Sequence, residues 1–185
     1  ESPVKLELAR IDSRPLSEII QVVNKVSQNL HAEILLREVG FQSVRAGSAE
    51  AGLNEMKALL ESLGAAKEDF DLRDGSGLSR LNLISPDLTV KLLVHMYQSQ
   101  LRDVWVASLP VGGEDGTLET RFAKMPEGKR VSAKTGTISH VSSLSGYIRS
   151  ATYGDVVFSV LSNGANVPSP EIRSAVDKIC VELAK

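Results

Sequence analysis

The order in which two hydrophobic periodicities follow each other constrains the fold of this chain most strongly. Apolar residues recur at helical spacing in the first half, whereas segments that favour strands dominate the last third. We expect strands at 130–137, 145–152 and 156–162, with a turn at Tyr153-Gly154-Asp155. So short a connection makes the last two strands antiparallel. A final amphipathic helix from Pro170 completes an α+β fold, in which helices pack on an antiparallel sheet.

The helical half is divided by residues that favour helix ends. Pro15 suits the first turn of a helix that runs to Val26. A second helical pattern passes through 32–36, and Gly40 is expected to end it. Further expected elements are a helix at 48–63, short strands at 4–8 and 70–72, a helix from Pro86 to about Ser99, and a long loop at 109–116.

The composition fits one globular domain and excludes several classes of protein. The 185 residues are 42% hydrophobic and 24% charged, which is enough apolar material for a core. A net charge of −2 without a basic stripe argues against a nucleic-acid partner. No apolar run approaches the roughly 20 residues of a membrane span. The first residues carry no signal pattern, so we expect any targeting segment to be absent or removed.

Lys134-Thr135-Gly136 is the most informative tripeptide of the chain. A lysine at a strand edge offers a fixed positive charge, and the threonine hydroxyl can donate to a carboxylate. Gly136 would keep that edge open to a ligand, and the N–H group of Thr137 could serve as an oxyanion donor. The alternative is a strand end in which the glycine permits a bulge.

Ser27-Gln28-Asn29 is a second candidate. Residues two apart on one helix point in nearly opposite directions, so Ser27 and Asn29 converge only if the helix breaks there. Asn29 would be a good N-cap for a following helix. The alternative is a helix–helix junction whose polar residues only cap.

Other polar groups favour structural roles. Asp74 to Arg80 contains two glycines around Ser76 and reads as a structural turn, since a nucleophile elbow would need glycine at position 74. The three histidines, His31, His95 and His140, lack metal-ligand spacing, so we expect no metal. The lone Cys180 cannot form an internal disulfide.

The set of motifs is more specific than its members. Ser-x-x-Lys, Ser-Asp-Asn and Lys-Thr-Gly are the signature of β-lactamases and penicillin-binding proteins, and this chain has the second (as Ser-Gln-Asn) and the third in order. The chain resembles the low-molecular-weight (class C) penicillin-binding proteins of the D-alanyl-D-alanine carboxypeptidase/endopeptidase type, peptidase family S13. The segments that carry the resemblance are 15–20, 24–29, 74–80, 108–110, 116–118 and 131–137.

The resemblance implies a β-lactamase/transpeptidase-like fold and an acyl-enzyme mechanism on peptidoglycan stem peptides ending in D-Ala-D-Ala. By this resemblance Ser27 relays a proton to the leaving amine, and Asn29 holds the substrate amide. Lys134 supplies positive potential, Thr135 binds the terminal carboxylate, and Thr137 provides half of the oxyanion hole. β-Lactams would mimic the substrate, no cofactor is needed, and the location is periplasmic or the extracytoplasmic cell envelope.

One departure from the family pattern concerns the nucleophile. The only Ser-x-x-Lys match is Ser2-Pro3-Val4-Lys5, which runs into a strand-like pattern instead of a helix, so we attribute it to chance. We therefore expect residues 1–185 to be a single unit, the C-terminal half of a catalytic domain. It should be inactive without the missing N-terminal part of the same enzyme, and apolar surface should be exposed where that part packs.

Two alternatives remain open from the sequence. The chain could be a non-catalytic module that binds stem peptides at its carboxylate-binding edge. It could also be a stand-alone β-lactamase-like hydrolase that uses Ser2 as its nucleophile.

Overall fold

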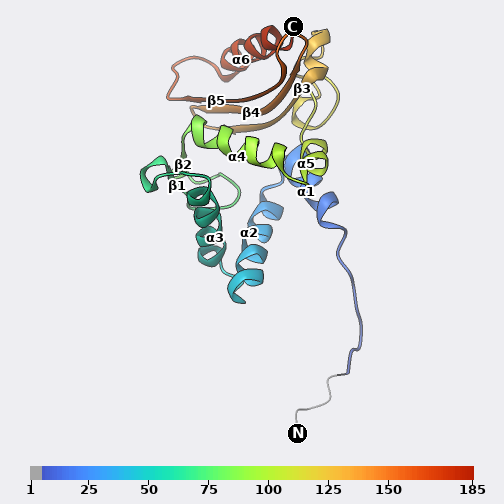
Figure 1. Ribbon diagram of the computed structural model, residues 1–185, viewed down its shortest axis with the longest axis vertical. Coiled ribbons are helices and arrows are strands. Elements are labelled where there is room, and N and C mark those ends of the chain that lie inside the picture. Colours follow the sequence, from blue (N-terminus) through green and yellow to red (C-terminus); the bar gives the residue numbers. More distant parts are fainter. Residues whose placement is uncertain (1–5) are drawn as a thin grey trace.

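The computed structural model describes residues 6–185, which form an α+β fold (Figure 1). Its helices are α1 (Leu16–Lys25), α2 (Asn29–Val44), α3 (Ala49–Ser62), α4 (Pro86–Gln98), α5 (Arg102–Ser108) and α6 (Ser169–Ala184). Its strands are β1 (Phe70–Asp71), β2 (Leu83–Ile84), β3 (Val131–Ile138), β4 (Val141–Ser150) and β5 (Gly154–Asn163). Short 3-10 helices lie at Lys67–Asp69, Gly116–Leu118 and Pro126–Arg130.

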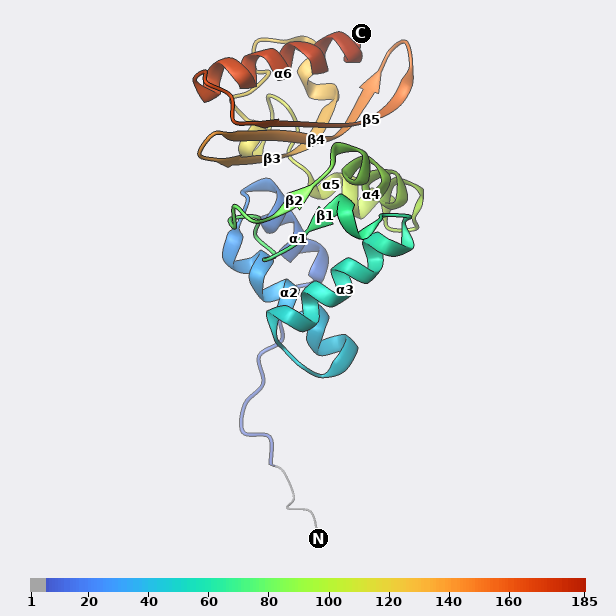
Figure 2. The ribbon, with the colours of Figure 1, turned by 90° about the vertical axis from the view of Figure 1, so that its left-hand side faces the viewer.

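The main sheet is an antiparallel meander of order β3-β4-β5. Figure 2 shows α6 on one face of this sheet and α4 and α5 on the other. In the register of β3 with β4, Lys134 lies opposite Ser145 and Gly136 lies opposite Ser143. Among residues 6–185, the other edge of β3 makes a single bridge, from Ser132 to Val111, and its C-terminal half pairs with no other strand.

Both faces of the central strand are buried, which explains why β4 is rich in apolar and small residues. Leu144 and Ile148 point to one face and join the core beneath Val176 and Cys180 of α6. Tyr147, between them in sequence, points to the other face and packs with Leu93 of α4 and with Leu109. The sheet is therefore the middle layer of three.

A smaller unit lies on the α4 side of the sheet, with α2 and α3 side by side at its far end (Figure 1). The two-residue strands β1 and β2 pair antiparallel beside it. Leu60, Phe70 and Leu88 form its buried cluster. The junction of α1 and α2 brings this unit to the edge of β3.

The expected α+β class with an antiparallel sheet is confirmed, but some details of the prediction are wrong. Helix α2 does not end at Gly40 but continues to Val44, because that glycine is buried where α3 packs against α2. The β4–β5 turn occupies 151–153, about two residues earlier than expected. Of the strand expected at 4–8, residues 6–8 are irregular and exposed, and the others lie outside the described residues.

Candidate active site

The break expected between the first two helices is present. Ser27 has a left-handed backbone conformation (φ 57°), which turns the chain between α1 and α2. The capping residue differs from the expectation: the Gln28 side chain accepts a hydrogen bond from the N–H of Leu30 (3.2 Å). Asn29 is instead the first residue of α2. Ser27 and Asn29 thus lie at a kinked junction and not on one continuous helix.

Lys134 of β3 reaches across to this junction. Its Nζ donates to Ser27 Oγ (2.7 Å) and to the carbonyl oxygen of Thr135 (2.8 Å). Burial lowers the pKa of the Lys134 ammonium group below its ordinary value. Among the described residues no carboxylate forms an ion pair with this amine, so its charge is available to an incoming anion.

Thr135, Gly136 and Thr137 follow Lys134 along the same edge of β3. Thr135 Oγ1 donates to Thr117 Oγ1 (2.8 Å), which fixes the rotamer of its hydroxyl. A Cβ at Gly136 would lie 2.4 Å from Ser143 Oγ, so a larger residue there would force that hydroxyl on β4 to rotate away. Thr137 is exposed at the open edge of the strand.

A cavity of about 490 Å³ lies between the α1–α2 junction and the edge of β3. It is lined by all six residues proposed from the sequence: Ser27, Asn29, Lys134, Thr135, Gly136 and Thr137. Segments more than a hundred positions apart therefore meet at one site, with a hydroxyl, an amine and a strand edge facing a common space. A hydroxyl and an amine at hydrogen-bonding distance can exchange a proton, and an amine without a paired carboxylate attracts an anion.

The opposite wall of the cavity was not predicted from the sequence. Residues Ser76 to Arg80, which the sequence presents as a structural turn and as one segment of the resemblance, line the cavity together with Asn82 and β2. Asp74 holds this loop by accepting from the N–H groups of Gly77 (2.7 Å) and Ser79 (2.6 Å). The two glycines and the aspartate indicate a tight turn, but nothing in them tells which surface the turn faces.

Glu33 of α2 anchors the same loop from below. Its Oε1 accepts from the N–H groups of Gly75 (3.0 Å) and Ser76 (2.9 Å). Glu33 lies one helical turn after Asn29, so the helix that carries Asn29 also holds this loop. The α1–α2 junction and the Asp74–Asn82 loop are thus parts of one hydrogen-bonded assembly.

The Ser-x-x-Lys match at Ser2 and Lys5 lies outside the described residues. Along α2, one stripe of large apolar side chains is exposed, which we call the α2 stripe: Leu30 (64% exposed), Ile34 (53%), Phe41 (41%) and Val44 (61%). That a further part of the enzyme packs on this apolar surface stays a prediction. In the described part of the chain, no helix has the length and hydropathy needed to span a bilayer.

The amino-acid sequence of this chain matches known proteins along nearly its whole length. Residues 4–183 match the family described as D-Ala-D-Ala carboxypeptidase 3 (S13) family. A D-alanyl-D-alanine carboxypeptidase of an Actinomadura species is 40% identical over 183 residues, which are 96% of this chain and 34% of that protein. The chain thus spans about a third of the length of this curated relative.

Two solved structures show the same fold. Penicillin binding protein 4 (DacB) of Haemophilus influenzae, in complex with a novel β-lactam, has a TM-score of 0.83 and 28% identity. The match covers 94% of this chain and 42% of that one. The TLA-3 extended-spectrum β-lactamase has a TM-score of 0.67 at 21% identity, covering 91% of this chain and 62% of that one, which is a likeness of fold alone.

Proposed function

The chain belongs to the D-Ala-D-Ala carboxypeptidase 3 (S13) family, and on that premise we propose that it supplies one wall of the active site of a serine-type D-Ala-D-Ala carboxypeptidase. The substrate is a peptidoglycan stem peptide that ends in D-Ala-D-Ala, and endopeptidase activity on related cross-links is part of the same proposal. β-Lactams acylate the enzyme as substrate mimics. A family of this kind acts on the cell wall, so the location is periplasmic or otherwise extracytoplasmic.

The observation that carries the proposal is the contact between Lys134 Nζ and Ser27 Oγ at 2.7 Å, inside the cavity. A hydroxyl bonded to an amine whose pKa is lowered by burial can relay a proton to a leaving amine. In this role Ser27 passes the proton, and the positive potential of Lys134 favours the substrate's terminal carboxylate.

The remaining residues of the site bind the substrate. Asn29 holds a substrate amide, and Thr135 binds the terminal carboxylate when its O–H turns from Thr117 Oγ1 to the substrate. Gly136 keeps the strand edge open, and the N–H group of Thr137 forms half of the oxyanion hole. These roles need no cofactor or metal.

The nucleophile comes, in our proposal, from a Ser-x-x-Lys helix outside the 185 residues. Its hydroxyl attacks the D-Ala-D-Ala carbonyl, the lysine of the motif takes the proton, and D-alanine leaves with the proton relayed by Ser27. Water then hydrolyses the ester. The exposed α2 stripe supports this arrangement, because a surface of that kind is suited to packing against further protein.

Acylation by a fluorescent penicillin tests the proposal. We expect covalent labelling of the intact protein that contains this chain, and none of the isolated 185 residues. Replacing Ser27 by alanine in the intact protein should slow labelling at least tenfold. Covalent labelling of the isolated chain would show that the nucleophile lies within it, and Ser2→Ala would then identify Ser2 or exclude it.

A non-catalytic stem-peptide-binding module is the second candidate. It is favoured by the fact that the whole Lys134–Thr137 edge lines a cavity on this chain alone. Titration of the isolated chain with a D-Ala-D-Ala peptide separates the two. The enzyme proposal predicts very weak binding, and the module predicts saturable binding.

A further inference from the structure

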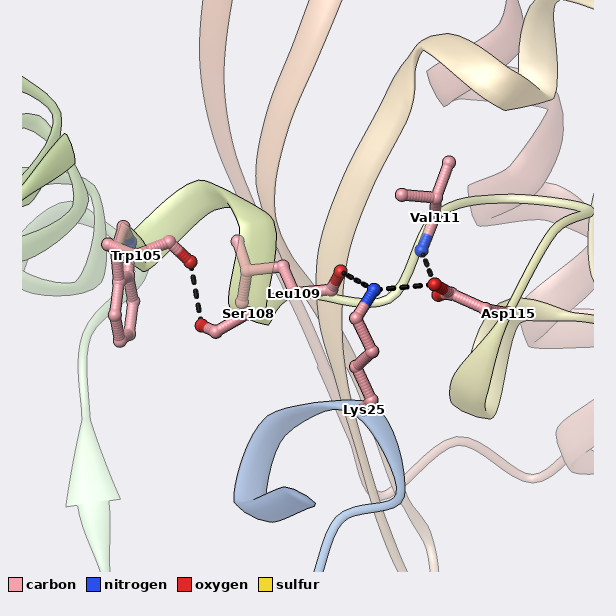
Figure 3. A network of polar contacts seen from close by, with 6 residues as sticks. All are labelled: Lys25, Trp105, Ser108, Leu109, Val111 and Asp115. Atoms are coloured by element: carbon pink, nitrogen blue, oxygen red, sulfur yellow. Dashed lines mark hydrogen bonds and ion pairs between the residues drawn. The ribbon is translucent and has the colours of Figure 1, made fainter. Parts of the chain in front are cut away.

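Lys25, two residues before Ser27, joins the end of α1 to the loop that precedes β3 (Figure 3). Its Nζ donates to the carbonyl oxygen of Leu109 (3.0 Å) and to Asp115 Oδ2 (2.5 Å). The other oxygen of Asp115 accepts from the N–H of Val111 (2.9 Å). The two ion-paired side chains are 24% and 43% exposed, so this pair is less screened by water than a fully exposed one.

The loop that Lys25 contacts is itself fastened to β3. The N–H of Ala133 donates to the carbonyl of Pro110 (2.9 Å), and the N–H of Gly112 donates to the carbonyl of Val131 (2.9 Å). A bridge between Val111 and Ser132 lies between these two bonds. The contacts of Lys25 therefore connect the end of α1 to the strand that carries Lys134.

The two residues after Asp115 tighten the same connection. Gly116 has a left-handed φ of 57°, and a Cβ there would lie 2.4 Å from the carbonyl oxygen of Lys25. Only glycine allows the loop to approach the end of α1 so closely. Thr117 follows directly and accepts the hydrogen bond from Thr135. One short segment thus touches both motifs of the site.

We propose that Lys25 and Asp115 are positioning residues, which hold Ser27 at hydrogen-bonding distance from Lys134. The proposal rests on the function proposed above, in which Ser27 relays a proton. Neither side chain lines the cavity, so neither contacts the substrate. They act by setting the gap between the α1–α2 junction and the edge of β3.

Charge and geometry favour this role over that of an incidental surface ion pair. Although burial of Asp115 raises its pKa, its hydrogen bonds to Lys25 and to the N–H of Val111 outweigh that effect, so the pKa is lowered overall. The carboxylate is therefore charged at neutral pH and binds both partners. A displacement of a reacting group by about 1 Å can lower a reaction rate by about a hundredfold. Contacts that fix the position of Ser27 therefore affect the rate of proton transfer.

The test uses the intact protein with Lys25→Met, which keeps the unbranched apolar part of the side chain and removes its charge and donors. Its first readout is the titration midpoint of the Lys134 amine, followed by NMR of ¹³Cε-labelled lysine and assigned with Lys134→Arg. Its second readout is the rate of acylation by a fluorescent penicillin. Asp177→Asn is the control, since Asp177 pairs with Arg121, does not line the cavity, and lies on α6, on the sheet face opposite α4 and α5 (Figure 2).

We expect Lys25→Met to displace the Lys134 midpoint in the same direction as Ser27→Ala and to slow acylation at least tenfold. Lys25→Arg, which keeps the charge, should recover part of both. The control should lose thermal stability while the Lys134 midpoint and the acylation rate stay unchanged. Asp115→Asn provides a second variant with the same expectation if Lys25→Met does not fold.

A Lys134 midpoint unchanged by Lys25→Met would overturn the positioning role, as would acylation at the wild-type rate. Either outcome would leave Lys25 with only a contribution to the stability of the folded protein. If the wild-type protein is not acylated at all, the proposed function fails, and the midpoint still decides whether Lys25 positions Ser27.

Discussion

The burial of Lys134 has a consequence for stability that can be measured separately from activity. Burial lowers its pKa below the ordinary value of 10.5. Between the lowered pKa and that value the unfolded chain binds more protons than the folded one, so the free energy of unfolding rises with pH through this window. Below it, the buried cation costs stability.

Lys134→Met should remove this dependence. We expect the free energy of unfolding of the wild type, minus that of the variant, to increase as the pH is raised towards 10.5. Urea unfolding of both proteins at several pH values from 7 upward measures this difference in the free energy of unfolding. Groups that titrate alike in both proteins contribute equally and cancel. A difference that falls with pH would mean that the folded protein binds the proton more tightly, contrary to the burial of this amine.

Cys180 gives a second prediction for a single residue. Its side chain is fully buried in the core between α6 and the sheet. Burial, with the nearby Asp177, raises the pKa of the thiol to about 12 against the opposing effect of Arg121. Because the thiolate is the reactive form, we expect Cys180 to react with Ellman's reagent at pH 8 only after unfolding. Rapid reaction of the folded protein would contradict the packing of α6.

Among the elements, the Asp74–Asn82 loop depends on a side chain of α2. Glu33→Ala removes the acceptor of the Gly75 and Ser76 N–H groups. A lost charged hydrogen bond is worth about 1.5 kcal/mol, so these two amides should exchange with solvent at least about tenfold faster. Hydrogen exchange measured by NMR tests this. Glu38→Ala, an exposed change on the same helix, is the control, and equal acceleration in both variants would contradict the anchor.

Helices and strands that are stabilised by contacts between residues near each other along the chain could be predicted from the sequence. The three long strands, α3, α4 and the last helix follow from periodicity and from residues that favour helix ends. The β4–β5 turn was misplaced because Gly154 resembles the centre of a two-residue turn. In the structure it has a left-handed φ of 76° and follows three turn residues, an arrangement found in longer hairpin loops.

Features that depend on distant contacts were not predictable in the same way. Helix α5 has seven residues and was missed, since so short a segment shows little periodicity. Ser27 and Lys134 could be paired from the order of the motifs, but the role of Asp74–Asn82 as a cavity wall depends on Glu33, more than forty positions away. The contacts of Lys25 likewise join segments whose proximity only the fold creates.

At the scale of the whole molecule, the α2 stripe makes a prediction about the isolated chain. Exposed apolar stripes bind the dye anilinonaphthalene sulfonate, so Ile34→Lys together with Phe41→Glu should lower dye binding markedly. Because both side chains are exposed in this chain, its free energy of unfolding should change by less than about 1 kcal/mol.

The matched control is Val39→Lys, which is also exposed but lies on the opposite side of α2. It should leave dye binding nearly unchanged. In the intact protein the paired change should reduce stability strongly, because our proposal buries the stripe against further protein. Equal stability of the intact variant and the intact wild type would contradict that packing.

The meander β3-β4-β5 also bears on the order of events during folding. Its strands are joined by tight turns, so each pairing closes only a short loop, and α6 follows directly along the chain. The contact of Ser27 with Lys134, in contrast, closes a loop of 107 residues. Since local contacts form faster than distant ones, we expect the sheet and α6 to fold first and the active-site cavity to be assembled last. The site is then the last part of the molecule to form and among the first to open.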